Sequence, residues 1–322
     1  MLLLFLIVSL GTFVSLLAAE YAVEGRQGTA HFLLTRLLLG FGTVFAIEWI
    51  FDTVKTPDDL AAKLGLTSLG VIPSVEKGGA VSDQLADPRS QVSKAYQSVR
   101  TALQFSTDHG VPRSLLVTST RASEGKSSTA LALAQTLASL GAKVLLIDAD
   151  LRKPTFRGPN STSQGLSSLL AGSTSVNESI HPTQMERLFL LPSGPIPPNP
   201  GELLASGRFK EVLDEVLTKF DHVVVDGPPV LGLADAPMLA SSCEGTLMVI
   251  EAGAIRRAAA LNAVNLLRAA DARLMGGILT KVNALKVGYG YGYGYGYSST
   301  EDLYAYRHGE EPKEQIEPLK SR

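Results

Sequence analysis

Cysteine is almost absent from this chain, which has 322 residues and a single cysteine, Cys243. No intrachain disulfide can form, and a zinc site built on several cysteines is excluded. The five histidines show no spacing typical of metal ligands. Excess charge is also lacking, because 29 Lys and Arg residues stand against 31 Asp and Glu residues. A net charge of −2 gives no reason to expect nucleic acid as a partner.

Charged residues are scarce as well, at 19% of the chain, where a soluble domain usually has about 25%. Hydrophobic residues make up 45%, which excludes a largely disordered chain. The shortage of charge therefore predicts that part of the chain lies in lipid. The length suggests about two domains of roughly 150 residues each.

Two apolar runs near the N-terminus account for this shortage. The first, Leu2 to Ala19, has 18 uncharged residues and would extend roughly 27 Å as a helix, close to the thickness of a bilayer core. The second, residues 32–51, carries charge only near its ends, at Arg36 and Glu48, and has Trp49 where an interfacial aromatic is expected. We predict a hairpin of two transmembrane helices whose ends lie on the same side.

Two alternatives to the hairpin stay open. The first run could be a signal peptide cleaved near Ala18 and Ala19, although it lacks the basic start of such peptides. One run could instead be a buried core helix.

Beyond residue 90, apolar segments of strand length alternate with helical segments. The predicted strands are 114–119, 143–148, 223–226, 246–251 and 277–282. Residues 127–140 predict a helix closed by Gly141, and an earlier helix begins near Thr56. Continuous apolar strands separated by helices indicate an α/β fold with a parallel sheet covered on both faces. Ligands of such sheets bind at the carboxyl ends of the strands.

The segment TRASEGKS, residues 120–127, follows one predicted strand and opens the next helix, as a phosphate loop does. Backbone N–H groups there hold phosphate oxygens, Lys126 would reach the β- and γ-phosphates, and Ser127 would bind Mg²⁺. Thr120 replaces the usual first glycine, and Ser123 occupies a place where glycine would relax the backbone. An ordinary Gly-Lys helix start is the simpler alternative. The predicted nucleotide-binding residues are Thr120, Arg121, Ala122, Ser123, Glu124, Gly125, Lys126, Ser127 and Ser128.

Two other strands end in carboxylates. Asp148 and Asp150 stand two residues apart, so in an extended segment they point to the same side and could share a metal or a proton. The run VVVDGPP places Asp226 at a strand end, as in a Walker B motif, whose carboxylate holds the Mg²⁺ shell. Each could also be a solvated turn residue. In combination with the phosphate loop they predict an Mg-ATP site, with Ser127, Asp148 and Asp226 at the metal.

Tyrosine is concentrated at the C-terminus, where GYGYGYGYGY covers residues 288–297 and seven of the nine tyrosines lie in the last 34 residues. Repeated glycine opposes a packed element, so we expect a mobile tail with accessible phenols. A low-complexity tail without a function is the alternative. Beside an Mg-ATP site these side chains are candidate phosphoacceptors: Tyr289, Tyr291, Tyr293, Tyr295, Tyr297, Tyr304 and Tyr306.

At these residues the chain resembles the bacterial tyrosine kinases, autokinases attached to capsule and exopolysaccharide export. The resemblance runs from about residue 32 to residue 306. It rests on the second apolar run, FDTVKTPDDLAAKLGLTSLGVIP, the phosphate loop, DADLRKP, SGPIPPNPGELLAS, VVVDGPP with Asp235 beyond it, and the tyrosine cluster. DADLR and the tyrosine cluster are its most specific parts. It implies a P-loop NTPase-type α/β fold related to the partition ATPases, here preceded by transmembrane helices.

The resemblance also implies residue roles. Lys126 and Ser127 would hold ATP and Mg²⁺, and Asp226 would occupy the Walker B position. Asp148 and Asp150 match a second Walker-type element, in which Asp148 would take the tyrosine proton. A free tyrosine has a pKa near 10, so a carboxylate beside its hydroxyl would assist attack at neutral pH.

Two further positions match related ATPases. Asn283 corresponds to an asparagine near the adenine, and Arg121 stands where partition ATPases carry a second lysine. The catalytic candidates are thus Lys126, Asp148, Asp150 and Asp226, with Asn283 added to the cofactor-binding set.

Three features depart from the family pattern. Ala122 and Ser123 stand where the family usually has Pro-Gly. Lys94, Gln97 and Arg100 stand where its oligomerisation helix carries Glu and two Arg. Only 12 residues separate the two runs, in place of a large extracytoplasmic domain, so the chain is either a short variant or incomplete at its start.

The resulting prediction divides the chain into a membrane region (1–51), a juxtamembrane linker (52–90), a P-loop tyrosine kinase domain (91–285) and a tyrosine-rich tail (286–322). The resemblance implies a bacterial inner-membrane protein with a cytoplasmic kinase domain, which regulates polysaccharide polymerisation or export. Its expected partners are its own tail in a neighbouring subunit of a homo-oligomer, the polysaccharide machinery and a phosphotyrosine phosphatase. A partition-type membrane-cycling ATPase and an ATP-sensing scaffold with weak catalysis are the alternatives.

Overall fold

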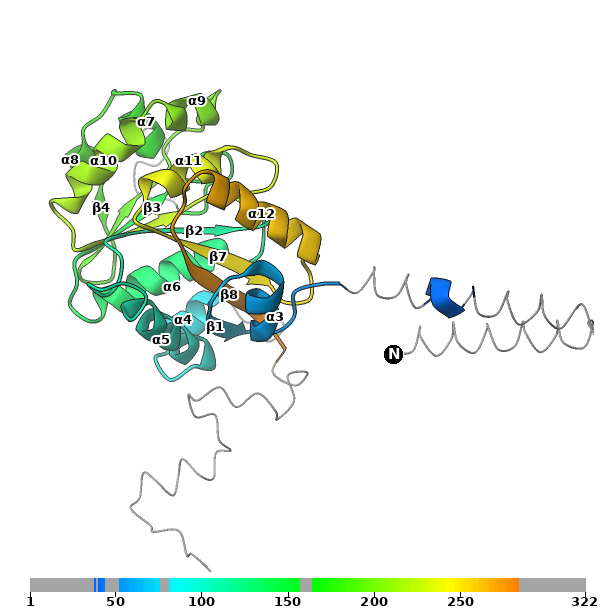
Figure 1. Ribbon diagram of the computed structural model, residues 1–322. Coiled ribbons are helices and arrows are strands. Elements are labelled where there is room, and N and C mark those ends of the chain that lie inside the picture. The colour runs from blue at the N-terminus through cyan, green and yellow to red at the C-terminus, as the bar shows by residue number, and fades with distance from the viewer. Residues whose placement is uncertain (1–37, 39, 44–51, 76–80, 157–163, 284–322) are drawn as a thin grey trace, which may run out of the picture.

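The computed structural model describes residues 38, 40–43, 52–75, 81–156 and 164–283. In this part of the chain the strands form one eight-stranded sheet in the order β1-β8-β7-β2-β6-β3-β5-β4 (Figure 1). All neighbours pair in parallel except β4 and β5. The strands are β1 Ser68–Pro73, β2 Ser114–Ser119, β3 Val144–Asp148, β4 His181–Pro182, β5 Leu188–Leu191, β6 His222–Asp226, β7 Gly245–Glu251 and β8 Leu274–Val282.

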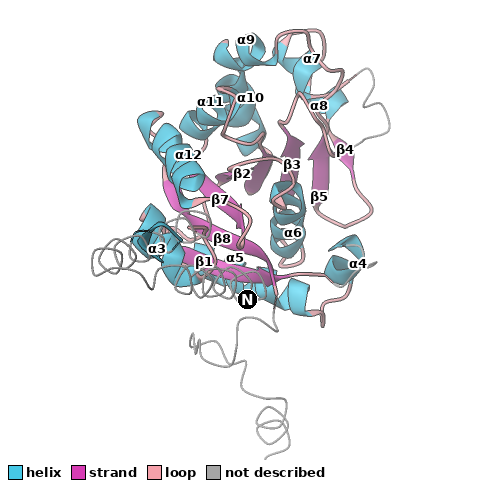
Figure 2. Cartoon of the chain, turned by 90° about the vertical axis from the view of Figure 1, so that its right-hand side faces the viewer, coloured by secondary structure: helices cyan, strands magenta, loops and turns pink. Residues whose placement is uncertain are grey.

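Helices cover both faces of this sheet. On one face lie α4 (Val81–Ala86), α5 (Gln91–Gln104) and α6 (Lys126–Ala138). On the other face lie α3 (Pro57–Leu64), α7 (Leu166–Leu170), α8 (Val176–Ser179), α9 (Pro200–Ala205), α10 (Arg208–Leu217), α11 (Asp235–Ser242) and α12 (Arg257–Ala269). Figures 1 and 2 show α6 and α12 on opposite sides of the strands.

The strands alternate between two hydrophobic cores. In β3, Val144 and Leu146 join the core beneath α5 and α6, whereas Leu145 and Ile147 join the core beneath the other helices. The neighbouring strands β2, β6 and β7 repeat this alternation, which is why the middle of each of these strands is apolar on both faces. The parallel sheet with two covered faces is therefore confirmed.

The predicted elements agree closely with the observed ones. β2 has the predicted bounds, and α6 begins one residue earlier than expected, at Lys126. Its C-cap is Ser139, and Gly141 follows in the left-handed region with a φ of 94°. β8 begins at Leu274, three residues before the predicted start.

The expectation of a linker over residues 52–90 is wrong for most of that segment. Thr56 and Asp59 form a capping box at the start of α3, and β1 pairs in parallel with β8 as an edge strand. Val54 is fully buried, and its N–H donates to the carbonyl of Ile255. The segment supplies apolar side chains to both cores, so it belongs to the α/β fold.

The predicted membrane region and tail lie largely outside the described residues. Residues 38 and 40–43 of the second apolar run are helical. Within the described ranges, no helix is long and apolar enough to cross a bilayer.

Leu60→Ala tests whether α3 is part of the folded core. Leu60 is fully buried, so its truncation should lower the free energy of unfolding by about 2–5 kcal/mol. Leu266→Ala on α12 is the matched control, because that leucine is 41% exposed and should cost about 1 kcal/mol or less. Urea unfolding of the purified chain measures both, and equal midpoints would return α3 to the status of a linker.

Candidate nucleotide site

The predicted phosphate loop lies between β2 and α6, in the expected strand–loop–helix context. Gly125 is the N-cap of α6 with a φ of 97°, and Ser123 has a φ of 70°. Both values lie in the left-handed region, which glycine adopts freely and serine only at a cost of about 1–2 kcal/mol. Ser123 therefore holds a conformation that glycine would relax, as the sequence predicts.

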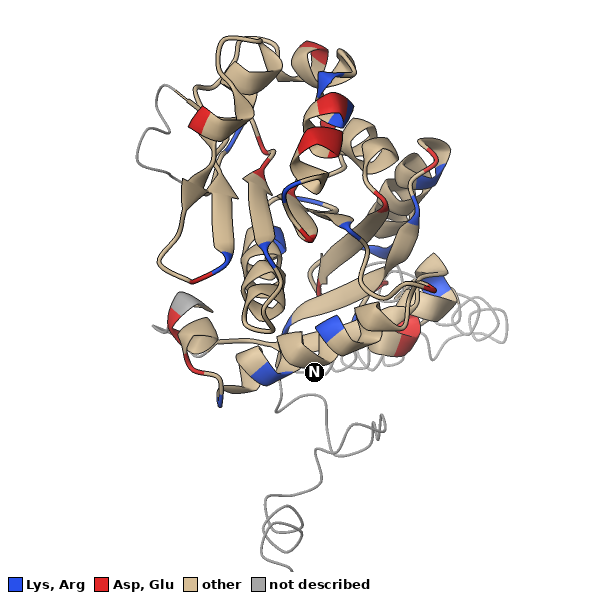
Figure 3. Ribbon diagram, turned by 90° about the vertical axis from the view of Figure 1, so that its left-hand side faces the viewer, with Lys and Arg blue, Asp and Glu red and all other residues tan. Residues whose placement is uncertain are grey.

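Lys126, the first residue of α6, lies among the carboxylates at the ends of the strands. Its side chain is 8% exposed, and its Nζ lies 3.0 Å from Asp150 Oδ2 and 3.5 Å from Asp226 Oδ1. Asp148 and Asp226 are register partners across β3 and β6. Figure 3 shows that the strands carry almost no charge along their length, so the charge of this sheet is concentrated at its ends.

Asp226 is fully buried, and among the described residues neither of its carboxylate oxygens has a hydrogen-bond partner. Burial raises the pKa of Asp226 to about 7, against the opposing effect of the Lys126 ammonium. The Ser127 hydroxyl lies close enough to this buried carboxylate to lower its pKa, although the two residues are far apart in the sequence. A buried carboxylate beside a hydroxyl fits the oxygen-rich shell that Mg²⁺ prefers.

Asp148 organises the loop that follows β3. Its Oδ2 accepts hydrogen bonds from the N–H groups of Thr155 and Phe156, both at 2.8 Å, and its Oδ1 accepts one from Asp150. Burial raises the pKa of Asp148 to about 6, although these hydrogen bonds lower it. The carboxylate is thus more basic than an exposed aspartate.

Two contacts that sequence reasoning missed hold the same loop. Arg152 donates two hydrogen bonds to buried Asp235 at the start of α11, at 2.8 and 3.3 Å. The hydroxyls of Ser127 and Thr155 lie 3.1 Å apart and join the loop to α6. DADLR and Asp235 are both in the sequence, but nothing in their spacing shows that they pair.

The remaining predicted residues are spread around the loop. Arg121 and Ala122 are exposed, Ser128 is half-buried, and Thr120 is buried. The Glu124 side chain is buried and accepts hydrogen bonds from the backbone N–H groups of Arg121 and Glu251.

The sequence also singles out residues outside the phosphate loop and the strand-end carboxylates. Asn283 is exposed immediately after β8. The seven tail tyrosines lie outside the described residues. On α5, Lys94 and Gln97 are exposed and Arg100 is half-buried.

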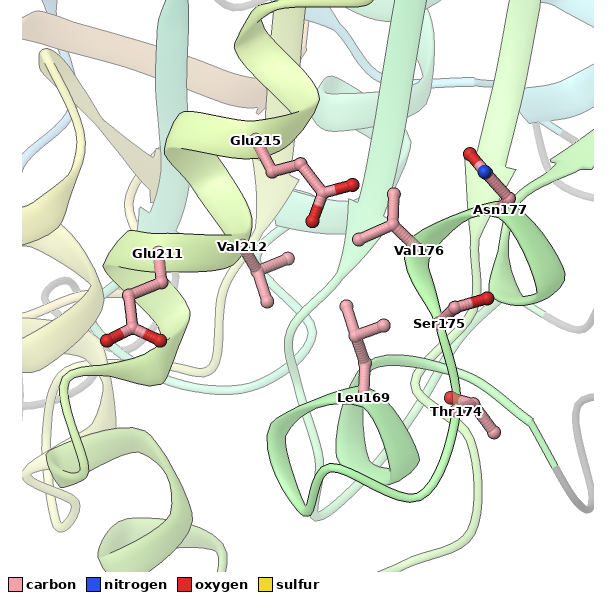
Figure 4. A pocket seen from close by; sticks show the side chains of 8 residues that line it. All are labelled: Leu169, Thr174, Ser175, Val176, Asn177, Glu211, Val212 and Glu215. Atoms are coloured by element: carbon pink, nitrogen blue, oxygen red, sulfur yellow. The ribbon is translucent and has the colours of Figure 1, made fainter.

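A separate pocket of about 260 Å³ lies between α7, α8 and α10. In Figure 4, Leu169, Val176 and Val212 point into it, with Glu215 beside them. Its acidic and apolar lining does not suit a nucleotide phosphate, so the chemistry belongs to the strand ends.

The phosphate loop, the buried lysine and the strand-end carboxylates define a P-loop nucleotide-binding α/β protein. A family model described as an AAA domain matches residues 115–257. The chain is 38% identical over 197 residues to the tyrosine-protein kinase YwqD of Bacillus subtilis, which covers 61% of this chain and 83% of that protein. It is 37% identical over 191 residues to the tyrosine-protein kinase CpsD of Streptococcus agalactiae, covering 58% and 82% respectively.

Solved structures give the same answer. The kinase domain of the Escherichia coli tyrosine kinase ETK has a TM-score of 0.67 and 28% identity, covering 76% of this chain and 100% of that one. The chimerical protein CapA2B2 has a TM-score of 0.64 and 33% identity, covering 71% and 100%. The chain belongs to the bacterial tyrosine-protein kinase family.

Asp226→Asn tests the buried carboxylate through pH. Without nucleotide, the folded protein keeps a proton on Asp226 up to about pH 7, whereas the unfolded chain releases it near the ordinary pKa of 3.8. The folded state therefore loses stability as the pH rises from roughly 4 through 7. Asparagine cannot ionise, so above pH 7 the variant should be more stable by roughly 1–4 kcal/mol, with the difference vanishing below about pH 4.

Melting temperatures of the nucleotide-free protein across this pH range measure the effect. Asp214→Asn is the control, because that carboxylate is 58% exposed on α10. A stability difference that does not change with pH would show that burial of charge is not its cause.

Proposed function

We propose that this protein is an ATP-dependent tyrosine autokinase that phosphorylates its own C-terminal tyrosines and so regulates polysaccharide polymerisation or export. One observation carries the proposal: the Lys126 ammonium lies at the head of α6 within 3.5 Å of carboxylates from both Asp150 and Asp226. Membership of the tyrosine-protein kinase family supports it. The polysaccharide role rests on the resemblance to kinases attached to capsule and exopolysaccharide export.

Mg-ATP is the proposed phosphoryl donor. The loop from Thr120 to Ser128 would surround its phosphates, and Asn283 would lie near its adenine. Ser127, Asp148 and Asp226 would hold Mg²⁺, directly or through water, and the metal would neutralise charge on the phosphates. Buried Asp226, with no hydrogen-bond partner among the described residues, supports this assignment.

Asp148 is the proposed acceptor of the tyrosine proton. As the tyrosine oxygen bonds to the γ-phosphorus, the bond from that phosphorus to the bridging oxygen of ADP breaks, and the phenolic proton passes to Asp148. Without metal or nucleotide, burial raises the pKa of Asp148 to about 6, so this carboxylate is more basic than an exposed aspartate and better suited to accept a proton. Lys126 would stabilise negative charge on the transferring and leaving oxygens.

The proposed acceptors are the seven tail tyrosines of a neighbouring subunit. Each phosphotyrosine adds about −1.5 to −2 charges, so seven would add roughly −10 to −14. The unmodified chain carries −2 in total. Repulsion of that size would oppose crowding of subunits, and a phosphotyrosine phosphatase would reverse it. We assign residues 1–51 to an inner-membrane anchor and residues 286–322 to the tail, with the kinase domain in the cytoplasm.

Lys126→Met should abolish autophosphorylation. Methionine fills a similar volume but removes the charge that would grip the phosphates, so phosphotyrosine formation should fall roughly 100-fold or more. Anti-phosphotyrosine detection with and without ATP, beside an ATP-hydrolysis assay, provides the measurement. Lys210→Met on α10 is the control, because that side chain makes only an exposed pair with Asp214.

The two assays also separate the alternatives. ATP hydrolysis without any phosphotyrosine in the unmodified protein would identify a partition-type ATPase. Nucleotide binding without either activity would identify a sensing scaffold. Undiminished phosphotyrosine in Lys126→Met, made in a strain without other tyrosine kinases, would remove Lys126 from the chemistry.

Replacing the seven tail tyrosines with phenylalanine should leave ATP binding intact and remove most phosphate incorporation. It should also keep the protein in its associated state, since the added negative charge can no longer form. Sedimentation of the protein with its natural tyrosines, before and after phosphatase treatment, is compared with sedimentation of this variant. A sedimenting mass that does not depend on phosphorylation would rule out the charge-driven switch while leaving the kinase assignment in place.

A further inference from the structure

Side chains that are not part of the Lys126 cluster join the phosphate loop to the ends of β7 and β8. Lys281 Nζ donates to the carbonyl of Ser123 at 2.7 Å and forms an ion pair with Glu251 Oε2 at 2.8 Å. Thr280 Oγ1 donates to the carbonyl of Glu124 at 2.6 Å. Two successive residues of β8 thus bind two successive carbonyls of the loop.

The Lys281 contact joins two strained residues. Ser123 has a φ of 70° and Lys281 a φ of 54°. In the described part of the chain only two other residues besides glycine have a positive φ, Arg187 and Asp271. Strained backbone persists where the surroundings over-determine it, and here the Lys281 side chain binds the backbone carbonyl of Ser123.

Glu124 strengthens the same connection from inside the loop. Its side chain is 1% exposed, and its two oxygens accept hydrogen bonds from the N–H groups of Arg121 and Glu251. Burial raises the pKa of Glu124 to about 7. Because both oxygens are already bound to backbone, Glu124 links the loop to the end of β7.

We propose that Lys281 is a positioning residue for the nucleotide site. Its ammonium binds the Ser123 carbonyl and so keeps the phosphate loop in a conformation that glycine would adopt without this contact. Ser123 stands where a freely rotating residue would suit the turn, and the contact from β8 stabilises the conformation that serine disfavours. The loop is then preformed for phosphate before nucleotide arrives, which lowers the ordering cost of binding. This inference rests on the proposed ATP site and assigns a role to a residue outside it.

The experiment combines removal of the Lys281 ammonium with removal of the backbone strain at Ser123. The variants are Lys281→Met, Lys281→Arg, Ser123→Gly and the double variant Lys281→Met with Ser123→Gly, each in the full chain. The affinity for a fluorescent ATP analogue with Mg²⁺ is measured directly, beside KM and kcat for autophosphorylation. Hydrogen exchange of residues 120–125 without nucleotide reports the order of the loop independently of activity.

Lys281→Met should weaken nucleotide binding roughly 5- to 10-fold, raise KM more than it lowers kcat, and speed exchange in the loop. Lys281→Arg should retain most of the affinity, because arginine can donate to the same carbonyl. Ser123→Gly should restore the affinity of Lys281→Met to within about twofold, since glycine adopts the required φ without the contact.

One control and three outcomes decide the result. Glu251→Gln removes the charge partner of Lys281 but leaves the contact with Ser123, so it should bind nucleotide nearly as well as the unmodified protein. An equal loss in Lys281→Met with or without Ser123→Gly would show an electrostatic effect on the phosphates and overturn the positioning role. Unchanged affinity in Lys281→Met would also overturn it. Failure of the unmodified protein to bind the analogue would instead refute the ATP site itself.

Discussion

The Lys126 ammonium is buried among carboxylates, and the arrangement of the strand ends follows from that constraint. A buried cation needs a negative partner, which Asp150 supplies at 3.0 Å. Asp226 Oδ1 lies 3.5 Å from the same ammonium, and burial raises the pKa of Asp226 to about 7. The cluster therefore contains more acid than base when nucleotide is absent. A divalent cation bound there would offset the excess negative charge and favour the ionised form of Asp226.

The sheet brings these groups together through strand order. β2, β6 and β3 are neighbours, although they are far apart in the sequence, and all three run in the same direction. The phosphate loop, Asp226 and Asp148 consequently meet at the carboxyl ends of these three strands. The two hydrophobic cores keep the strands in this register, since a shift by one residue would exchange the sides of every apolar residue. Packing far from the site thus sets distances within it.

The loops at these strand ends depend on each other. The loop after β3 is held by hydrogen bonds to Asp148 and by the Arg152–Asp235 pair, which connects it to α11. The phosphate loop is held by contacts with the ends of β7 and β8. The site therefore depends on five neighbouring strands of the sheet, from β8 to β3. Serine disfavours the left-handed φ that Ser123 adopts, so we infer that these contacts stabilise it.

The sequence alone determined the parallel α/β fold, the phosphate loop and the carboxylates at strand ends, because buried strands are continuously apolar and site residues follow them directly. It also indicated the strain at Ser123, where a glycine was missing. It did not reveal that residues 52–75 complete the sheet, since an edge strand such as β1 has a weak apolar pattern. Nor could it show the pairs Arg152–Asp235 and Lys281–Ser123, whose partners are 83 and 158 residues apart. Only the tertiary structure decided those contacts, because strand order and loop packing place side chains together without leaving a regular spacing along the chain.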